Sequence, residues 1–251
     1  MTRYPHLFSL ALFEVGAVAL LFVISSVYHR TGRSESIAGA ATAGAILLVG
    51  MALLATASYV VAAVTPLPLY DNALAAADRR LGFDWAEWMA WTQSRAWMSR
   101  SFEVAYDAML PELVGAVLYL GFLRKSGWLL TTLFIGGALT ALISGFFPAI
   151  GHLPSAPHVP VLRALRAGQL MDVMPQGLIS FPSYHTTVAV LLTGAFRGSR
   201  FLFPMACVLN GVMVVSTLSV GGHYLVDVIA GVGVARIAHL IAQLNVRSMN
   251  R

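Results

Sequence analysis

The sequence has little charge and almost no cysteine. Only 11% of its 251 residues are Asp, Glu, Lys or Arg, against about a quarter in soluble globular domains. A soluble domain is therefore excluded as the class of this protein. The single cysteine, Cys207, lies in an apolar run, so the chain has no disulfide framework. Linkers rich in Pro or Ser, low-complexity tracts and clear internal repeats are also missing, so we expect one domain over residues 1–251.

The sequence is instead rich in long runs of apolar residues. The chain is 58% hydrophobic, and its runs of about 18–25 apolar residues match the length of helix that crosses a bilayer. We therefore predict an all-α integral membrane protein, with a kink at Pro111. The first run carries Glu14 and lacks a clear cleavage site, so we interpret it as a retained helix rather than a signal peptide. The seven predicted spans cover residues 7–28, 36–64, 102–123, 128–147, 183–196, 201–218 and 223–244.

Two connecting segments have a composition of their own. Residues 65–101 contain four of the five tryptophans and alternate apolar with charged residues at helical spacing. Indole rings favour the membrane–water boundary, so this pattern predicts amphipathic helices lying along the interface. Residues 148–182 are rich in Pro and His, which favours a loop.

The basic residues indicate an orientation. The net charge is +5, and with seven spans the short basic connections fall on one side, which should be cytoplasmic. Both histidine motifs described below then face the opposite side, which we expect to be the periplasmic side of a bacterial inner membrane. A nucleic-acid partner is disfavoured because the arginines form no basic stripe. The basic groups are His29, Arg30 and Arg33; Arg124 and Lys125; Arg197 and Arg200; and Arg247 and Arg251.

The stretch VGGHYLVDVIAG places ionisable groups where an apolar helix begins. His223 and Asp227 are four residues apart, a spacing that puts two side chains on one face of a helix. An aspartate at that distance can fix the imidazole tautomer and leave the other ring nitrogen free to attack or to bind metal. A charged carboxylate inside a membrane span costs about 2.5–3.5 kcal/mol, which favours a functional role over simple pairing with a neighbouring helix.

The stretch FPSYH predicts a second helix start. Pro182 suits a turn, Ser183 can cap the helix, and His185 falls in its first turn. A helix N-terminus binds anions readily, because its free N–H groups and its dipole both attract negative charge. Two such starts, each with a histidine and both on one side of the membrane, predict phosphate chemistry.

The two motifs together resemble a known family. FPSYH followed 38 residues later by HYLVD is similar to the second and third signatures of the type 2 phosphatidic acid phosphatase superfamily. Within this superfamily, the sequence HYLVDVIAG resembles most the branch with inositol-phosphorylceramide synthase and sphingomyelin synthase. DRRLGFDW, AYDAMLPE and LRAGQ extend the resemblance over residues 77–231. It implies a six-helix core, at about residues 36–245, with one extra N-terminal transmembrane helix.

The resemblance also implies a mechanism. His223 would attack phosphorus and form a phosphohistidine, which Asp227 would orient and stabilise. His185 would protonate the leaving oxygen and then activate water or an acceptor alcohol. Backbone N–H groups near Ser183 and Gly222 would hold the phosphoryl oxygens.

The sequence departs from the family pattern at its cationic positions. Tyr184 stands where the superfamily has Gly, Thr217 stands where it has Arg, and the first signature is missing as such. Another arginine would then bind the phosphate. The candidates are Arg166 first and Arg163 second, with Arg79 and Arg80 further candidates for which plain contact with lipid headgroups is the simpler interpretation.

The most consistent function is that of a lipid-phosphate phosphatase, with a lipid phosphate and membrane lipids as its partners and no cofactor or metal. The family admits phosphatidate, isoprenyl phosphates and sphingolipids as donors. Transfer of a phospho-headgroup to a lipid alcohol, such as ceramide or diacylglycerol, is the close alternative. A metal hydrolase using His185, His223 and Asp227, with His152 and His158 nearby, and a transporter or channel with Asp227 in a proton relay, are weaker alternatives.

Overall fold

The computed structural model describes residues 5–153, 156, 158–169, 178 and 180–249, with side chains described from residue 13 to 244. Secondary structure in this part of the chain is helical throughout, as predicted. The helices in chain order are α1 (Pro5–Thr31), α2 (Glu35–Val64), α3 (Asp71–Arg80), α4 (Trp85–Gln93), α5 (Ala96–Asp107), α6 (Met109–Phe122), α7 (Gly127–Phe146), α8 (His158–Arg166), α9 (Tyr184–Ala195), α10 (Leu202–Ser216) and α11 (Leu225–Met249).

The long helices confirm an integral membrane protein. Among the described residues, five segments are long and apolar enough to cross a bilayer: residues 13–31, α2, α5 with α6, α7, and residues 225–244. The two other predicted spans exist as helices but are short, since α9 has 12 residues and α10 has 15. At a rise of about 1.5 Å per residue, α9 is roughly 18 Å long, less than the ~30 Å hydrocarbon core.

The third predicted span differs in its bounds. We expected one helix over residues 102–123 with a kink at Pro111, but the helix begins at Ala96 and is interrupted at Ala108. Proline lacks the N–H that would bond to the carbonyl of Asp107, and its ring crowds that carbonyl. The helix therefore ends at Asp107, and Pro111 lies in the first turn of α6, where proline is tolerated.

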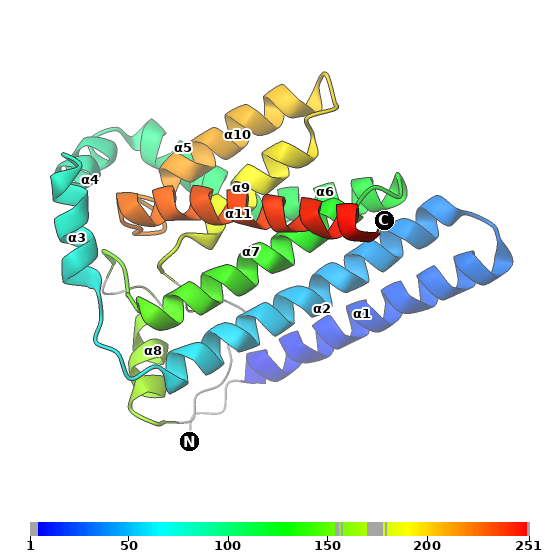
Figure 1. Cartoon of the computed structure of the whole chain (residues 1–251), viewed down its shortest axis with the longest axis horizontal. Helices are drawn as coiled ribbons and strands as arrows, with labels where there is room; N and C mark the ends of the chain where they lie inside the picture. Colours follow the sequence, from blue (N-terminus) through cyan, green and yellow to red (C-terminus); the bar gives the residue numbers. More distant parts are fainter. Residues whose placement is uncertain (1–4, 154–155, 157, 170–177, 179, 250–251) are drawn as a thin grey trace.

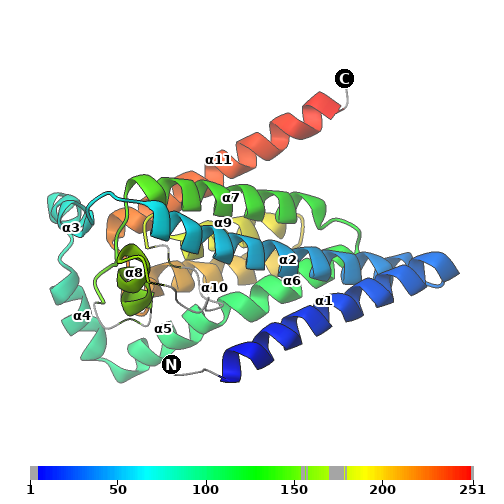
Figure 2. The ribbon, with the colours of Figure 1, turned by 90° about the horizontal axis from the view of Figure 1, so that it is seen from below.

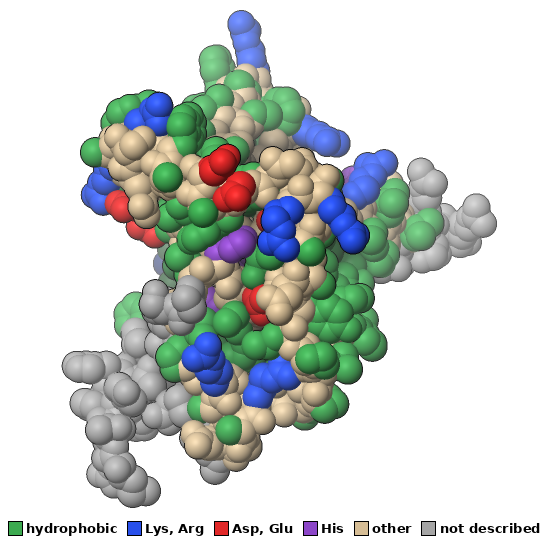
Figure 3. All heavy atoms as spheres, turned by 90° about the vertical axis from the view of Figure 1, so that its left-hand side faces the viewer, with side chains coloured by type: hydrophobic (Ala, Val, Ile, Leu, Met, Phe, Trp, Pro, Cys, Tyr) green, Lys and Arg blue, Asp and Glu red, His purple; other side chains and the backbone are tan. Residues whose placement is uncertain are grey.

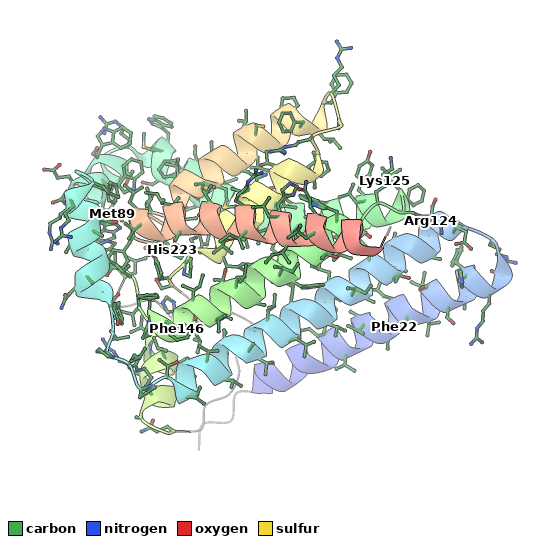
Figure 4. The ribbon with its side chains drawn as sticks, viewed as in Figure 1. Phe22, Met89, Arg124, Lys125, Phe146 and His223 are labelled. Carbon is green, nitrogen blue, oxygen red and sulfur yellow. The ribbon has the colours of Figure 1, made fainter. Side chains whose placement is uncertain are left out.

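The two ends of the bundle are built from different elements. The helices α3, α4 and α8 gather at one end, while the α1–α2, α6–α7 and α9–α10 connections lie at the other (Figures 1 and 2). Figure 4 shows His223 toward the first end and Arg124 and Lys125 at the second. The short basic connections therefore share one end, and α3 and α4 lie across the opposite end, as expected of interfacial helices.

The predicted loop at residues 148–182 contains a helix, α8, so that prediction was wrong for residues 158–166. Val161 is buried against Tyr59 of α2, together with Leu178, and Leu165 packs beside them. This apolar face is what holds α8 onto the end of α2.

The main core lies where α2, α6, α7, α9 and α11 pack together. Its buried members include Leu47, Val117, Leu133, Leu192 and Ala235. This core sets the relative positions of α9 and α11, the two helices that carry the histidine motifs.

Candidate active site

Helices α9 and α11 cross at very short range. A Cβ atom on Gly231 would lie 2.5 Å from the carbonyl oxygen of Ser183, so only glycine permits this approach. The Thr187 hydroxyl donates to the Gly231 carbonyl at 3.0 Å, and the Ser183 N–H donates to the Asp227 carbonyl at 3.1 Å. These bonds tie the start of α9 to the first two turns of α11 and bring the two histidine motifs together.

His223 and Asp227 form a buried pair. His223 Nδ1 lies 3.1 Å from Asp227 Oδ2, and the same oxygen accepts the Tyr224 N–H at 3.0 Å. Asp227 is 0% exposed and His223 is 5% exposed. With Nδ1–H donating to the carboxylate, the lone pair of the neutral ring is on Nε2, the nitrogen that remains available for chemistry.

The backbone of this pair differs from the expectation. We expected α11 to begin at His223, but it begins at Leu225, so His223 lies in the turn before the helix. Its N–H donates to the Thr217 carbonyl at 3.1 Å, and Gly222 has a φ of 62°, which favours glycine. Asp227 therefore reaches back toward the turn, rather than lying above His223 on one helix face.

His185 completes a pair of facing imidazoles. Its ring centroid lies 6.2 Å from that of His223, and the Tyr106 ring of α5 stacks on it at 4.6 Å. A Cβ on Gly221 would lie 2.9 Å from the His223 ring and 3.1 Å from Tyr106, so glycine at this position allows the rings to gather. Figure 3 views this end face-on and shows histidine side chains near the centre of the face, among acidic and basic groups.

The start of α9 has two free donors. Ser183 is the N-cap, as predicted, and its Oγ accepts from the Thr186 N–H at 3.3 Å, while its carbonyl accepts from Thr187. The N–H groups of Tyr184 and His185 donate to no other described residue. The Tyr184 hydroxyl donates to the Leu133 carbonyl of α7 at 3.0 Å. Replacing the family's glycine with Tyr184 thus fills the core and leaves both backbone donors open.

The first N–H groups of α11 are already bonded to a side chain of the protein. Asp78 of α3 is 2% exposed, and its two carboxylate oxygens accept the N–H groups of Leu225 at 2.8 Å and Val226 at 3.0 Å. A carboxylate at this place satisfies the free donors and the positive end of the helix dipole. The expectation that both helix starts are open anion sites is therefore wrong for α11.

The segment expected to form interfacial helices, residues 65–101, also supports the site. Asp71 accepts the N–H groups of Ile150 at 3.1 Å and Gly151 at 2.9 Å, and the Tyr224 hydroxyl at 3.0 Å. Burial, together with the charge of Asp71, raises the pKa of the Tyr224 phenol. Trp85 of α4 donates from its indole to the Leu218 carbonyl at 2.8 Å. The helices α3 and α4 therefore hold the turn that carries His223.

The predicted phosphate-binding arginines lie on α8. Arg166 donates through Nη2 to the Leu67 carbonyl, and its Nη1 is buried without a partner among the described residues. Arg163 is exposed. Within the described part of the chain, no hydrogen bond or ion pair joins either arginine to the histidine pair.

Gly222 and Thr217 have structural roles in the turn. A Cβ on Gly222 would meet Leu153 at 2.6 Å, and the Gly222 carbonyl accepts the His152 N–H at 2.7 Å. Thr217 is fully buried, and its hydroxyl donates to the Val214 carbonyl within its own helix. The position that carries an arginine in the family pattern therefore supplies no cation here.

Among the described residues, no group of three or more His, Cys, Asp or Glu side chains is arranged to hold a metal ion.

Comparison with known proteins gives one match. The model of the PAP2 superfamily matches residues 72–241, which run from α3 into α11 and include His185, His223 and Asp227. Neither the curated proteins nor the solved structures contain a match to the chain.

Proposed function

The chain belongs to the PAP2 superfamily, whose members are phosphatases or phosphotransferases, and from this premise we propose that it is a membrane lipid-phosphate phosphatase acting through a phosphohistidine. The observation that carries the proposal is the buried His223–Asp227 pair facing His185. A nucleophile oriented by a carboxylate and faced by a second acid–base group is the arrangement that covalent catalysis needs.

In the first half-reaction, His223 Nε2 attacks phosphorus. A P–N bond forms, the bond from phosphorus to the lipid oxygen breaks, and protonated His185 gives its proton to that oxygen. Asp227 accepts the Nδ1–H bond throughout and stabilises the positive charge that the His223 ring acquires. The products of this step are a lipid alcohol and a phosphorylated His223.

In the second half-reaction, neutral His185 takes a proton from water. The water oxygen attacks phosphorus, the P–N bond breaks, and its electron pair returns to His223 Nε2. Inorganic phosphate leaves, and His185 is again protonated for the next cycle.

The phosphoryl oxygens need donors, and the start of α9 offers them. The free N–H groups of Tyr184 and His185 project from a helix N-terminus that Ser183 caps, where backbone donors suit the charge that develops in the transition state. Gly222 and the two arginines of α8, Arg166 and then Arg163, are the further candidates. Nη1 of Arg166, which has no partner among the described residues, is a donor available to an anion.

The proposed location is the inner membrane of a bacterium, with the site facing the periplasm. The histidine pair lies at the end of the bundle away from the short basic connections (Figure 4), and such connections favour the cytoplasm. Lipid substrates would then reach the site at the headgroup plane.

The second candidate function is phosphotransfer to a lipid alcohol, which the sequence HYLVDVIAG favours. That stretch resembles the branch with inositol-phosphorylceramide synthase and sphingomyelin synthase. The first half-reaction is the same, and the acceptor's hydroxyl replaces water in the second.

The test is phosphate release from phosphatidate, an isoprenyl pyrophosphate and a sphingoid phosphate, measured in EDTA with purified protein. The wild type is compared with His223→Ala and with the control His239→Ala, which changes another histidine of α11 that bonds to Gln243. We expect release that survives EDTA, disappears in His223→Ala and persists in the control.

Other results would change the proposal. Release that EDTA abolishes would overturn the metal-free mechanism. Turnover seen only with a phosphodiester donor and an added lipid alcohol would favour the transferase. Equal release by His223→Ala and the wild type would remove His223 as the nucleophile.

A further inference from the structure

A third ring borders the two imidazoles of the candidate site. Tyr106, near the end of α5, stacks on His185 with 4.6 Å between the ring centroids and 20° between the ring planes. We propose that the hydroxyl of Tyr106 binds one oxygen of the phosphoryl group that His223 attacks. The inference rests on the proposed function and adds to it a side chain from outside the two histidine motifs.

The edge of Tyr106 also lies close to His223. A Cβ atom on Gly221 would lie 2.9 Å from Cδ2 of His223 and 3.1 Å from Cε2 of Tyr106, so the two ring edges border the same small space. In an imidazole Cδ2 is bonded to Nε2, and in a phenol Cε2 is bonded to the carbon that carries the hydroxyl. The Tyr106 hydroxyl is therefore near the edge of His223 that carries the proposed nucleophilic nitrogen.

The hydroxyl of Tyr106 has no partner among the described residues. Two other tyrosines near the site use their hydroxyls within the protein, because Tyr184 donates to the Leu133 carbonyl and Tyr224 donates to Asp71. The Tyr106 hydroxyl is also not among the sealed polar atoms that lack a partner. A phenol keeps its proton at neutral pH, so this hydroxyl is an accessible donor that the protein itself does not use.

The packing of α5 fixes the position of this ring. Ala105, next to Tyr106 in the chain, is buried in one cluster with Ala189 of α9. Ala189 is one helical turn after His185, so this cluster holds the end of α5 against the start of α9. The helix ends at Asp107, directly beyond this contact. The position of the hydroxyl is therefore set by the fold before a substrate arrives, which is the condition for effective transition-state stabilisation.

The proposed reaction needs more donors than the start of α9 supplies. A phosphoryl group in transfer spreads its charge over three equatorial oxygens. The start of α9 offers two N–H groups, those of Tyr184 and His185, that donate to no other described residue. In the described part of the chain, no arginine is joined to the histidine pair by a hydrogen bond or an ion pair. The Tyr106 hydroxyl, beside both imidazoles, is a donor for the third oxygen.

The hydroxyl and the ring of Tyr106 can be tested separately. Phenylalanine keeps the ring that stacks on His185 and removes only the proposed donor, so Tyr106→Phe isolates the hydroxyl. The matched control is Tyr119→Phe, which removes the same group from α6. The Tyr119 ring lies 6.5 Å from that of Phe196, at the opposite end of α9 from Ser183.

The first experiment measures binding rather than turnover. Orthovanadate forms five-coordinate adducts that resemble a phosphoryl group in transfer, and its binding to the purified full-length protein is measured by isothermal titration calorimetry. We expect Tyr106→Phe to bind it about 10–100-fold more weakly than the wild type, as for a lost hydrogen bond to a charged group. Tyr119→Phe should bind it as the wild type does.

The second experiment repeats the phosphate-release assay with the same variants. The kcat/KM of Tyr106→Phe should fall by a factor similar to its loss of orthovanadate affinity, because the same bond serves both. Its thermal unfolding should match that of the wild type, since the hydroxyl has no partner among the described residues.

Three results would overturn the inference and leave the proposed function standing. The first is equal orthovanadate binding by Tyr106→Phe and the wild type with unchanged release. The second is a lower kcat with unchanged orthovanadate binding, which would make the hydroxyl a proton donor instead. The third is equal weakening in Tyr119→Phe. A wild type that neither binds orthovanadate nor releases phosphate from any lipid would instead overturn the proposed function, and this inference with it.

Discussion

The starts of α9 and α11 look alike in sequence and differ in structure. Each follows a turn, each has a histidine close by, and they are held together where Ser183 meets Gly231. The start of α9 is capped by its own Ser183 and keeps two N–H groups that donate to no other described residue. The start of α11 is capped from a distance by Asp78, which takes the donors of Leu225 and Val226.

The difference in capping suggests that the two helix starts have different roles in the proposed mechanism. A helix start with free donors can receive a phosphate, whereas one that holds a carboxylate is already satisfied. In the proposed mechanism, the start of α11 therefore fixes the position of His223, and the start of α9 is left for the substrate. The predictions below test this division, from the largest expected effect to the smallest.

Asp227→Asn should have the largest effect, and it acts on the rate. The amide can still accept the Tyr224 N–H, but it removes the negative charge beside His223. We expect kcat to fall by about 10²–10⁴-fold, in the range of a lost acid–base partner, with little change in thermal stability. A variant that retains full activity would contradict the role of Asp227 in orienting and stabilising the nucleophile.

Asp78→Ala should lower stability. It leaves the N–H groups of Leu225 and Val226 without an acceptor in a buried place, and charge-assisted bonds of this kind contribute about 1.5–3 kcal/mol. Thermal unfolding of the purified protein should show the loss, and Asp78→Asn, which keeps one acceptor oxygen, should recover part of it. If both variants melt like the wild type, the cap on α11 is not stabilising.

Ser183→Ala should have the smallest effect on stability. Only the Thr186 N–H and hydroxyl lose a partner, and removal of an N-cap side chain costs about 1 kcal/mol. The same unfolding measurement, made beside Asp78→Ala, compares the two helix starts directly. A larger loss for Ser183→Ala than for Asp78→Ala would reverse the comparison.

Local patterns in the sequence predicted much of the fold and of the candidate site. The apolar runs placed the long helices, and Ser183 was identified as a cap from its position. His223 and Asp227 do meet, but across the turn before α11 rather than on one helix face, as their spacing had suggested. Each of these signals lies within a few residues, where the geometry of a helix limits the choices.

The capping of α11 by Asp78 could not be predicted from local sequence patterns. Asp78 and Leu225 are 147 residues apart, and their contact depends on how α3 folds across the end of the bundle. No pattern around either residue encodes that packing. The exact start of α11 was missed for the same reason, because the turn before it is fixed by Thr217, Gly222 and Asp78 together.

The helix α8 could have been found. Val159, Leu162 and Leu165 recur at helical spacing, and Pro160 lies in the first turn, where proline is common. The abundance of Pro and His in the surrounding segment outweighed this periodicity in the prediction.

The distant cap on α11 has a consequence for how the protein is made. Helix α3 is synthesised early, and its Asp78 carboxylate has no helix start to bind until α11, the last described helix, has been made and inserted. His223, the proposed nucleophile, is therefore fixed in place only after α11 has been inserted. A chain that stalls before α11 is inserted leaves Asp78 without the helix start that it caps and His185 without His223, so the proposed active site forms only when α3, α9 and α11 have packed together.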